Sequence, residues 1–526
     1  MVNIKNEILK RRNLPVRFFN PTIQDKGDAA KLHNIGRAKD LFLSYVKDKE
    51  KKITVVADPD IDGIMASTIM YQWIKNIHNG VKISHHQRNK GHGVIPERIN
   101  KTDLLIIVDS SSNSIEEVKL ILQQGKAADI IILDHHETDG KINEIPNVVL
   151  VNPHQPLDKY RNKHLSGGLL TFKFLEYCEG YIDNAMSHQL IDLAAISIVS
   201  DVMNVAEMEN RYYYYEGTRL IKNKGLATLL YKLNIDCSNI NSTDLAFKLN
   251  KALNSTLRLQ NIILIFKLIL YYQSDEDISF VQQIIENIQK RENIENEIIS
   301  SISILHDSKG VILAQNNYSE ANSMSNNFNG VIASKMADRE GKNVAVVSKG
   351  LRGSGRAYAD YNFKDYINNS GYATGAGHQG AFGINILDLE SLRSYIIDHP
   401  PIFEVDDTYD IELKFKDLTK KLFAEVMDLQ YLIGSGFDEI KFKIADVIVE
   451  DIKQTSGGNT YYVSDKTKKY IRFMDKSPNT KEIKKGNTIC VYGTLRINTF
   501  FGKEYYECHC YNIKVIDDKI DDSWGF

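Results

Sequence analysis

Three alternate aspartates open a loop directly after a short apolar run, and their spacing suggests metal chemistry. Asp58, Asp60 and Asp62 lie in the sequence DPDIDG, which follows the run ITVVA at 53–57. Carboxylates crowded in this way repel one another unless a cation holds them, and hard divalent cations prefer oxygen ligands. A calcium-binding EF-hand loop also begins DxDxDG. That alternative fails because a strand-like run precedes the loop and the twelfth position is Ile69, where an EF-hand needs Glu.

Further carboxylates and a histidine pair follow other apolar segments. Asp109 lies in IIVDSSS, Asp134 comes before His135 and His136 after IIIL, and Asp201 ends the helix-like segment IDLAAISIVSD. Each has an ordinary alternative when taken alone: a helix cap, a turn or a helix terminus. Together they predict a mixed oxygen and nitrogen site, which suits Mn²⁺ or Mg²⁺ better than a thiolate-type zinc site does. Two such ions ~4 Å apart can activate a water and neutralise a phosphodiester.

Positioning these side chains requires a sheet that gathers strand ends at one edge. Three apolar runs, at 53–57, 104–108 and 130–133, are separated by helix-like stretches at 64–78 and 114–124. Buried strands alternating with helices predict a parallel α/β sheet. Ligands of such sheets bind beyond the carboxyl ends of the strands, and the acidic residues fall there.

The remainder of the chain shows three successive secondary-structure patterns. A long helical pattern without Pro comes first, then a second alternating pattern with a Gly-rich region, and, after Pro400-Pro401, a helix near 415–432 followed by short strands with turn signals. The last pattern predicts a small OB-like β-barrel. We therefore expect an α/β catalytic domain at 1–211, a helical connector at 212–306, a second α/β substrate-binding domain at 307–400, a helix plus nucleic-acid-binding barrel at 401–516 and an acidic tail at 517–526.

Composition and charge limit the class of protein. With 43% hydrophobic and 25% charged residues in a chain of 526, a globular protein of several domains is expected. The net charge of −3 does not exclude nucleic-acid binding, because a local basic groove suffices. No apolar run approaches the roughly 20 residues of a membrane span, and MVNIKNEILKRRNL lacks the apolar core of a secretory signal.

The number and spacing of the cysteines indicate a reducing cellular compartment. Five scattered cysteines argue against a disulfide framework. Cys508-His509-Cys510 has no partner pair, so strand residues explain it better than a zinc site does. We expect a cytoplasmic protein without a membrane partner.

The order of the motifs resembles the DHH phosphoesterase family. DPDIDG, VD, LDHH and SDV occur in this order, and further pieces are similar to RecJ single-strand exonucleases. These pieces are NKGHGV (89–94), VNPHQP (151–156), SGG (166–168), RGSGRAY (352–358) and GAGHQGAFGI (375–384). The resemblance covers roughly residues 30–390, and its RecJ part depends on length, connector and barrel. The chain has SGG, SDV and GAGH where the family has SGxG, ADV and GGH, and none of these changes removes a metal-binding side chain.

The resemblance implies roles for the acidic constellation. Two divalent ions, Mn²⁺ or Mg²⁺, would be held, with Asp109 bridging them. Asp134 would orient His135, His136 would face the scissile phosphate, and Asp62 would ligate a metal or position the attacking water. The implied metal ligands are Asp58, Asp60, Asp109, His135 and Asp201.

A glycine-rich segment and two arginines form a second candidate site. Glycines let a backbone approach a phosphate closely, although a tight turn requiring positive φ is the alternative. Arg352 and Arg356 could clamp a phosphate or form a solvated pair. The resemblance favours a substrate-binding site across a cleft from the metals. The set is Arg352, Ser354, Arg356, Gly375, Gly377 and His378.

The barrel region mixes basic and aromatic residues, a pattern typical of single-strand binding. About half of the aromatic residues should belong to the barrel core. The acidic tail, DDKIDDSWGF, is similar to the partner-docking termini of single-strand DNA-binding proteins, although most such tails are simply disordered. The basic residues are Lys466, Lys468, Lys469, Arg472, Arg496 and Lys503, and the aromatic ones are Tyr461, Tyr470, Phe473, Phe500, Phe501 and Tyr505.

The resulting prediction is a metal-dependent exonuclease that degrades single-stranded DNA to nucleoside monophosphates in repair or recombination. The 5′ to 3′ polarity is implied by the resemblance alone. Expected partners are single-stranded DNA and either a single-strand DNA-binding protein or a helicase. A phosphodiesterase for short oligonucleotides or cyclic dinucleotides is one alternative, and its members are usually shorter and lack the barrel. A non-catalytic DHH-like replication scaffold is the other, and such scaffolds have lost metal-binding carboxylates.

Overall fold

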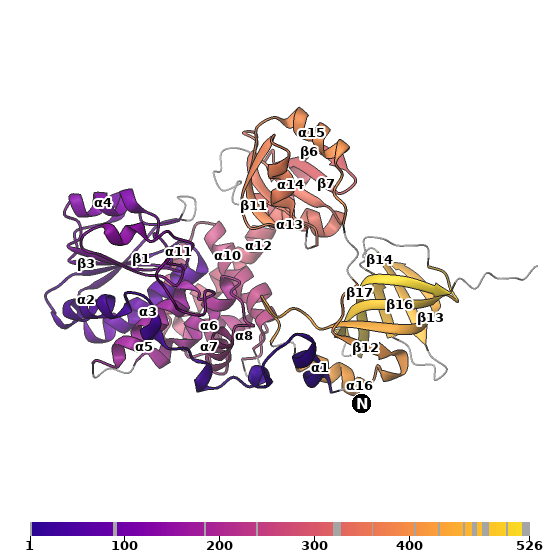
Figure 1. The fold of residues 1–526 in the computed structure, drawn as a ribbon, viewed down its shortest axis with the longest axis horizontal. Helices are drawn as coiled ribbons and strands as arrows, with labels where there is room; N and C mark the ends of the chain where they lie inside the picture. Colours follow the sequence, from indigo (N-terminus) through magenta and orange to yellow (C-terminus); the bar gives the residue numbers. More distant parts are fainter. Residues whose placement is uncertain are drawn as a thin grey trace, which may run out of the picture. The chain divides into compact units, whose positions relative to one another are not determined.

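In the computed structural model (Figure 1), the chain forms two compact units. One unit comprises Met1–Thr22, Asn241–Thr243 and Glu404–Phe526, and the other comprises Ile23–Ile240 and Asp244–Phe403. The structure describes residues 3–87, 92–182, 186–237, 240–318, 328–359, 361–403, 407–429, 432–455, 458–464, 471–475, 483–500 and 503–517.

A five-stranded parallel sheet is the centre of the first α/β domain, with strand order β2-β1-β3-β4-β5. Every side chain of β3, LLIIV, is buried, as expected for a central parallel strand covered on both faces. Helix α4 packs on one face, and α2, α3 and α5 lie on the other (Figure 1). The strands are β1 (Ile53–Ala57), β2 (Val81–His85), β3 (Leu104–Val108), β4 (Asp129–Leu133) and β5 (Val148–Val151). The helices are α2 (Ile35–Lys47), α3 (Ile61–Ile77), α4 (Ile115–Gln123) and α5 (Gly167–Glu179).

A helical region follows, as the periodicity predicted. Its last helix, α12, extends from this region into the second α/β domain, where Ile298 enters the core. A buried Arg291 pairs with Glu295 on α12, and Glu295 also binds Lys335 of the second domain at 2.6 Å. The helices are α6 (Ile191–Ser200), α7 (Met208–Thr218), α8 (Lys224–Lys232), α9 (Ser242–Asp244), α10 (Asn250–Arg258), α11 (Ile262–Phe266) and α12 (Ile278–Ser301), with π-helical turns at Leu245–Leu249 and Lys267–Tyr271. None of the helices in the described ranges is long and apolar enough to cross a membrane.

The second α/β domain has a six-stranded mixed sheet of order β10-β11-β9-β8-β7-β6, in which β7 and β8 are parallel. Helix α13 covers one face, and α14 and α15 cover the other. The strands are β6 (Ser303–Ser308), β7 (Val311–Gln315), β8 (Asn343–Val347), β9 (Arg352–Arg356), β10 (Ala373–Gly377) and β11 (Ala381–Ile386). The helices are α13 (Asn329–Glu340), α14 (Phe363–Asn369) and α15 (Leu389–Asp398).

The C-terminal region is a closed barrel, which confirms the predicted fold class. Strands β13-β14-β15-β17-β16 form a sheet that closes through the β13–β16 pairing, and β12 joins β13 in parallel. Cys508 and Cys510 are fully buried strand residues. The elements are β12 (Ile411–Lys414), α16 (Lys420–Met427), β13 (Lys441–Thr455), β14 (Gly458–Ser464), β15 (Ile471–Asp475), β16 (Thr488–Phe500) and β17 (Lys503–Asp517).

The predicted basic and aromatic residues of the barrel divide between core and surface. Tyr461 and Phe473 are buried in the barrel. Arg472 stacks over Tyr505 with 3.7 Å between guanidinium carbon and ring centroid, and Arg496 pairs with Glu439. Outside the described residues, or with undescribed side chains, lie Lys466, Lys468, Lys469, Tyr470, Phe500, Phe501 and the tail from 518 onward.

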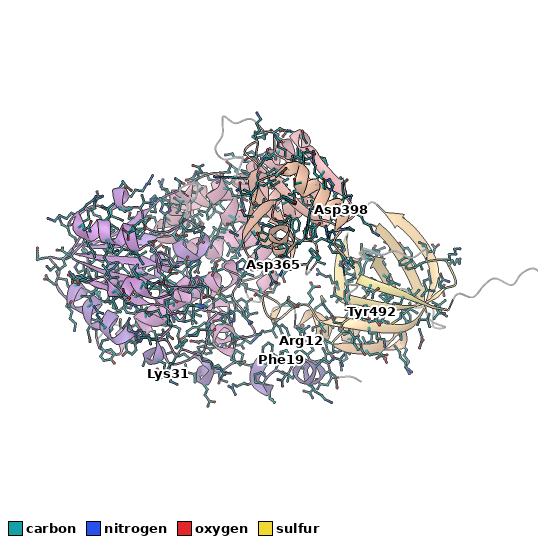
Figure 2. The ribbon with its side chains drawn as sticks, turned by 45° about the horizontal axis from the view of Figure 1, so that its top comes forward. Arg12, Phe19, Lys31, Asp365, Asp398 and Tyr492 are labelled. Atoms are coloured by element: carbon teal, nitrogen blue, oxygen red, sulfur yellow. The ribbon has the colours of Figure 1, made fainter. Side chains whose placement is uncertain are left out.

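The N-terminal segment packs on the barrel unit. After α1 (Ile4–Arg11), Arg12 donates from Nε and Nη2 to the carboxylate of Asp410, at 2.7 and 2.6 Å. The ring of Phe18 lies 4.9 Å from that of Phe437, centroid to centroid. Arg12 and Phe19 mark this segment in Figure 2. We expected the catalytic domain to begin at residue 1, whereas the structure groups residues 3–22 with the C-terminal unit.

Candidate metal centre

The carboxyl edge of the parallel sheet gathers the predicted acidic residues. Asp58 directly follows β1, Asp109 follows β3, and Asp134 follows β4. Asp60 is the N-cap of α3, where its carboxylate accepts a hydrogen bond from the Gly63 N–H at 2.9 Å. Asp201 comes from the helical side, as the C-cap of α6. The fold therefore brings these five residues to one edge, as the spacing predicted.

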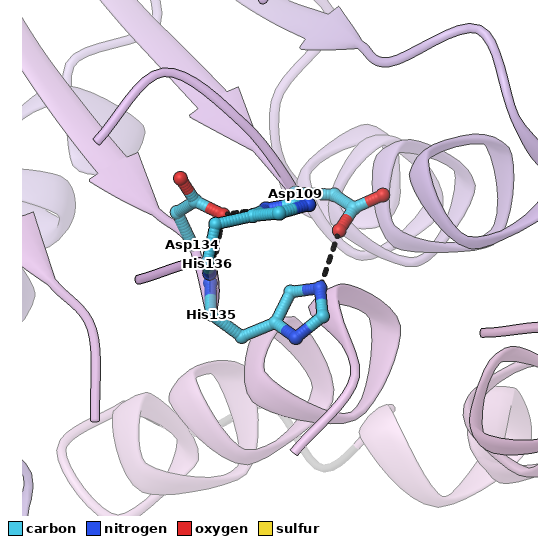
Figure 3. Close-up of side chains that lie close together, drawn as sticks. All are labelled: Asp109, Asp134, His135 and His136. Carbon is cyan, nitrogen blue, oxygen red and sulfur yellow. Dashed lines mark hydrogen bonds and ion pairs between the residues drawn. The ribbon is translucent and has the colours of Figure 1, made fainter. Parts of the chain in front are cut away.

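Three carboxylate oxygens converge on the Nε2 atom of His135. Its Nε2 lies 3.1 Å from Asp109 Oδ1, 3.3 Å from Asp201 Oδ2 and 3.8 Å from Asp62 Oδ2. Figure 3 shows the Asp109 and His135 side chains facing one another. None of His135 Nε2, Asp109 Oδ1 and Asp201 Oδ2 has a hydrogen-bond partner among the described residues.

These unsatisfied atoms fit a divalent cation. Leaving buried polar atoms unpaired is costly, and one imidazole nitrogen can donate only one proton to the surrounding carboxylates. Oxygen and nitrogen atoms about 3 Å apart have the spacing of ligands that share an ion with bonds of about 2.1 Å. His135 belongs to two groups of side chains able to hold a metal: one with Asp109, Asp134 and His136, and one with Asp62 and Asp201.

The pKa values of this cluster also favour a bound cation. Burial, followed by the neighbouring carboxylates, raises the pKa of Asp62 to about 7, that of Asp201 to about 8, and that of Asp109 well above its usual range. Burial, together with the nearby His136, lowers the pKa of His135 to about 4, so its imidazole is neutral and keeps a lone pair for a metal. The cluster thus holds more negative charge than it can tolerate without a proton or a cation.

A second group of ligand atoms lies beside the first. Asp58, 1% exposed as a side chain, approaches His92 Nδ1 with Oδ2 at 2.5 Å and accepts the Gly93 N–H with Oδ1 at 2.9 Å. Asp58, Asp60 and His92 together could hold an ion. His92 was not among the predicted site residues, although its motif, NKGHGV, was noted. Its position at the same sheet edge, after the strand next to β1, is the signal that could have identified it.

Asp134 fixes the loop that carries the two histidines. Its carboxylate accepts hydrogen bonds from the backbone N–H groups of Ser112, His135 and His136, at 2.9, 2.7 and 3.2 Å. It also accepts from His136 Nδ1 at 2.7 Å (Figure 3). Asp134 therefore holds the backbone of His135, whereas the imidazole that it contacts belongs to His136.

This contact sets the charge of both partners. Although burial alone would raise the pKa of Asp134, the hydrogen bond and charge of His136 hold it well below its usual range. The same hydrogen bond raises the pKa of His136 to about 9. His136 therefore presents a partly exposed cation beside the carboxylates.

Glycines of the SGG motif let helix α5 approach the centre. The N–H groups of Gly167 and Gly168 donate to the two carboxylate oxygens of Asp62 at 2.7 and 2.8 Å. A Cβ on Gly167 would lie 2.4 Å from Asp109 Oδ1, and one on Gly168 would lie 2.4 Å from Ser197 Oγ. Asp109 itself has a φ of 62°, which is uncommon for a residue with a side chain. The motif thus allows close packing around the carboxylates of Asp62 and Asp109.

The VNPHQP motif connects two loops of the centre. The fully buried Asn152 donates through Nδ2 to Ser112 Oγ and to the carbonyl oxygen of His136, both at 2.9 Å. It therefore joins the loop after β3 to the loop after β4.

The structure also places the residues of the second candidate site. Arg352, Ser354 and Arg356 alternate along β9 and share one face of the sheet. Arg356 Nη1 donates to the Gly355 carbonyl at 2.7 Å, and a Cβ on Gly330, at the start of α13, would lie 2.6 Å from Nη2. Burial lowers the pKa of Arg356.

The glycines of this site have different surroundings. A Cβ on Gly375 would lie 2.9 Å from the buried ring of Phe382, so close packing alone explains that glycine. Gly377 has a φ of 126°, at the end of β10. His378 is exposed in the turn between β10 and β11. A substrate role for these residues stays a prediction.

Comparisons with known proteins agree with this geometry. The model of the DHH family, N-terminal domain, matches residues 52–198. YorK of Bacillus subtilis, a prophage protein predicted to be a single-strand DNA-specific exonuclease, is 25% identical over 97% of this chain and 96% of its own length. The single-stranded-DNA-specific exonuclease RecJ of Dickeya dadantii is 23% identical over 44% of this chain and 43% of its own length.

Solved structures share the fold over 98% of the chain. RecJ from Thermus thermophilus in complex with Mn²⁺ superposes with a TM-score of 0.73, at 19% identity, over 98% of this chain and 78% of that one. The complex of the same RecJ with Mg²⁺ superposes with a TM-score of 0.68, over 98% of this chain and 77% of that one. Residues 52–198 thus match the DHH family, N-terminal domain, and 98% of the chain shares the fold of the RecJ structures.

Proposed function

We propose that the chain is a divalent-metal-dependent exonuclease that hydrolyses single-stranded DNA to nucleoside monophosphates, with 5′ to 3′ polarity, in DNA repair or recombination. The observation that carries the chemistry is the convergence of three buried atoms without hydrogen-bond partners, Asp109 Oδ1, His135 Nε2 and Asp201 Oδ2. The substrate is supported by the similarity to YorK over nearly the full length of both chains. The polarity and the pathway are carried over from the resemblance to RecJ, and the cytoplasmic location is proposed from the few, scattered cysteines.

The proposal includes two ions. Asp109, His135 and Asp201 would hold one, Asp58 and Asp60 would hold the other, and Asp109 would bridge them. Bound there, the ions would lower the pKa of a water and neutralise the oxygens of the phosphodiester. RecJ structures with Mn²⁺ and with Mg²⁺ support either metal.

Residues of the chain itself would bind and orient the substrate. His136 donates from Nδ1 to Asp134 and has a pKa raised to about 9, so at neutral pH its second nitrogen also carries a proton. That N–H would donate to an oxygen of the scissile phosphate. Asp62, tied to the start of α5 by two backbone N–H groups, would position the carboxylate cluster.

The other domains would hold the strand. Arg352 and Arg356, two residues apart on either side of Ser354 on β9, would bind phosphate groups. The stacked pair of Arg472 and Tyr505 gives the barrel a cation beside an aromatic ring, which suits a base and its phosphate. A single-strand DNA-binding protein or a helicase completes the proposed partners.

The test is hydrolysis of single-stranded oligonucleotides labelled at the 5′ or the 3′ end, with Mn²⁺ and again with EDTA. Immediate release of labelled mononucleotide from the 5′ end, abolished by EDTA, is expected. Release from the 3′ label first would overturn the polarity alone. Absence of cleavage despite tight binding would instead favour a scaffold, and cleavage restricted to dinucleotides would favour the smaller-substrate phosphodiesterase.

A further inference from the structure

We propose that His92 is a metal ligand, which completes the second ion site together with Asp58 and Asp60. The inference rests on the proposed two-metal function and assigns that site a nitrogen ligand. It makes the second site a mixed site, like the one around His135.

His92 and Gly93, which follow β2, each contact one oxygen of the Asp58 carboxylate. Gly93 donates its backbone N–H to Oδ1 at 2.9 Å, while the imidazole of the adjacent His92 brings Nδ1 within 2.5 Å of Oδ2. Asp58 is almost completely buried, so its carboxylate is fixed by its surroundings. The His92 imidazole therefore contacts Oδ2 of Asp58, whereas the Gly93 N–H binds Oδ1.

The third atom of the group comes from the start of α3. One carboxylate oxygen of Asp60, one of Asp58 and a ring nitrogen of His92 all lie within 4.8 Å of one another. Metal–ligand bonds of about 2.1 Å place two ligands of one ion at most ~4.2 Å apart. Side-chain movements of a fraction of an ångström would therefore allow all three atoms to bind one ion.

The charge of the neighbourhood favours coordination over a simple hydrogen bond. No Lys or Arg side chain pairs with Asp58, Asp60 or Asp109 within the part of the chain that the structure describes. A proton shared between His92 and Asp58 would leave Asp60 without a cation. A divalent ion bound by all three side chains would satisfy each of them at once.

A nitrogen ligand has a consequence for metal choice. Imidazole favours first-row transition metals, and affinity rises from Mn²⁺ towards Co²⁺, whereas Mg²⁺ prefers oxygen alone. The second site should therefore discriminate against Mg²⁺ more strongly than a site made of carboxylates only.

The experiment measures metal binding rather than hydrolysis. Calorimetric titration of the full chain with MnCl₂ is compared for wild type, His92→Ala, His92→Asn and the matched control His188→Ala, which changes an exposed histidine of the same domain. Wild type and the control should bind two ions. Both His92 variants should lose at least tenfold in affinity for one of them, and their Mn²⁺ over Mg²⁺ preference at that site should fall.

A spectroscopic arm identifies the ligand directly. In His135→Ala, the nitrogen hyperfine coupling of bound Mn²⁺, measured by pulsed electron paramagnetic resonance, should come from His92. It should vanish in the double variant His135→Ala/His92→Ala.

The outcomes separate the two proposals. Two ions bound with wild-type affinity by His92→Ala would overturn this inference and leave the proposed function intact. Weakened binding without any nitrogen coupling in His135→Ala would also overturn it, because His92 would then only position Asp58. A wild-type chain that binds fewer than two ions would defeat the two-metal proposal itself, and this inference with it.

Discussion

Adding one methyl group at Gly167 should disable the metal centre while leaving the helix that carries it intact. Gly167 is the first residue of α5, and a Cβ there would lie 2.4 Å from Oδ1, 2.5 Å from Cβ and 2.6 Å from Cγ of Asp109. Ordinary contacts lie at 3.4–4 Å. Since the clash involves the base of the Asp109 side chain as well as its tip, rotation of the carboxylate cannot relieve it.

The expected magnitude follows from that displacement. Asp109 or α5 must move by roughly 1 Å, whereas metal–ligand distances tolerate only about 0.2 Å. A misplacement of about 1 Å can cost on the order of 100-fold in rate. We therefore expect Gly167→Ala to reduce hydrolysis at least ~100-fold and to weaken Mn²⁺ binding. Overpacking of this kind costs about 1–3 kcal/mol of stability.

Gly36→Ala is the matched control. Gly36 is the second residue of α2, and a Cβ there would meet nothing within 4 Å. It should stabilise the fold by about 0.4–1 kcal/mol and leave hydrolysis unchanged. The assays are urea denaturation in EDTA, calorimetric Mn²⁺ titration and hydrolysis of labelled single strands. A Gly167→Ala protein within threefold of wild type in both affinity and rate would refute the packing argument.

Three further predictions concern charge. Asp109→Asn should abolish hydrolysis, keep DNA binding and, in EDTA at pH 8, raise the free energy of unfolding, because it removes a buried carboxylate whose pKa is raised; lower stability in EDTA would contradict this. In EDTA the wild type should lose stability as pH rises from about 4 to about 8, because folded Asp62 and Asp201, with pKa values raised to about 7 and 8, hold protons that the unfolded chain has released; a Tm that is flat or rises over this range would argue against the raised values. Arg356→Ala should weaken single-strand binding and reduce the slope of log affinity against log salt by about one phosphate, whereas the exposed Arg339→Ala should not; equal slopes for both would exclude the phosphate contact.

The strands that carry ligands could be predicted because their local signals are strong. The runs at 53–57 and 104–108 coincide with β1 and β3, and 130–133 falls within β4. β2 was not expected, since VKISH at the sheet edge is short and has little apolar character. The order of the strands was not predicted. The placement of the acidic residues at one sheet edge was expected from the rule that ligands of parallel sheets bind beyond the carboxyl ends of the strands.

Two features of the site were not predicted from the sequence, one because it depends on a distant contact and the other because it depends on the geometry of a turn. Nothing within NKGHGV indicates that the backbone of Gly93 and the ring of His92 contact Asp58, which is 35 and 34 positions away, respectively. The loop binds that carboxylate only once the sheet has formed. Asp134 was expected to orient His135; its carboxylate accepts the backbone N–H of His135, while the imidazole that it contacts is that of His136.

The packing of residues 3–22 on the barrel unit has a consequence for biosynthesis. Arg12 and its partner Asp410 are 398 positions apart. At ~5–20 residues per second, the ribosome would expose the N-terminal segment roughly 20–80 s before the strands that receive it. During that interval Phe18 and the α1 helix have no native neighbour from the barrel. The barrel unit can therefore reach its final packing only after its C-terminal strands have been synthesised, and residues 3–22 must remain accessible until then.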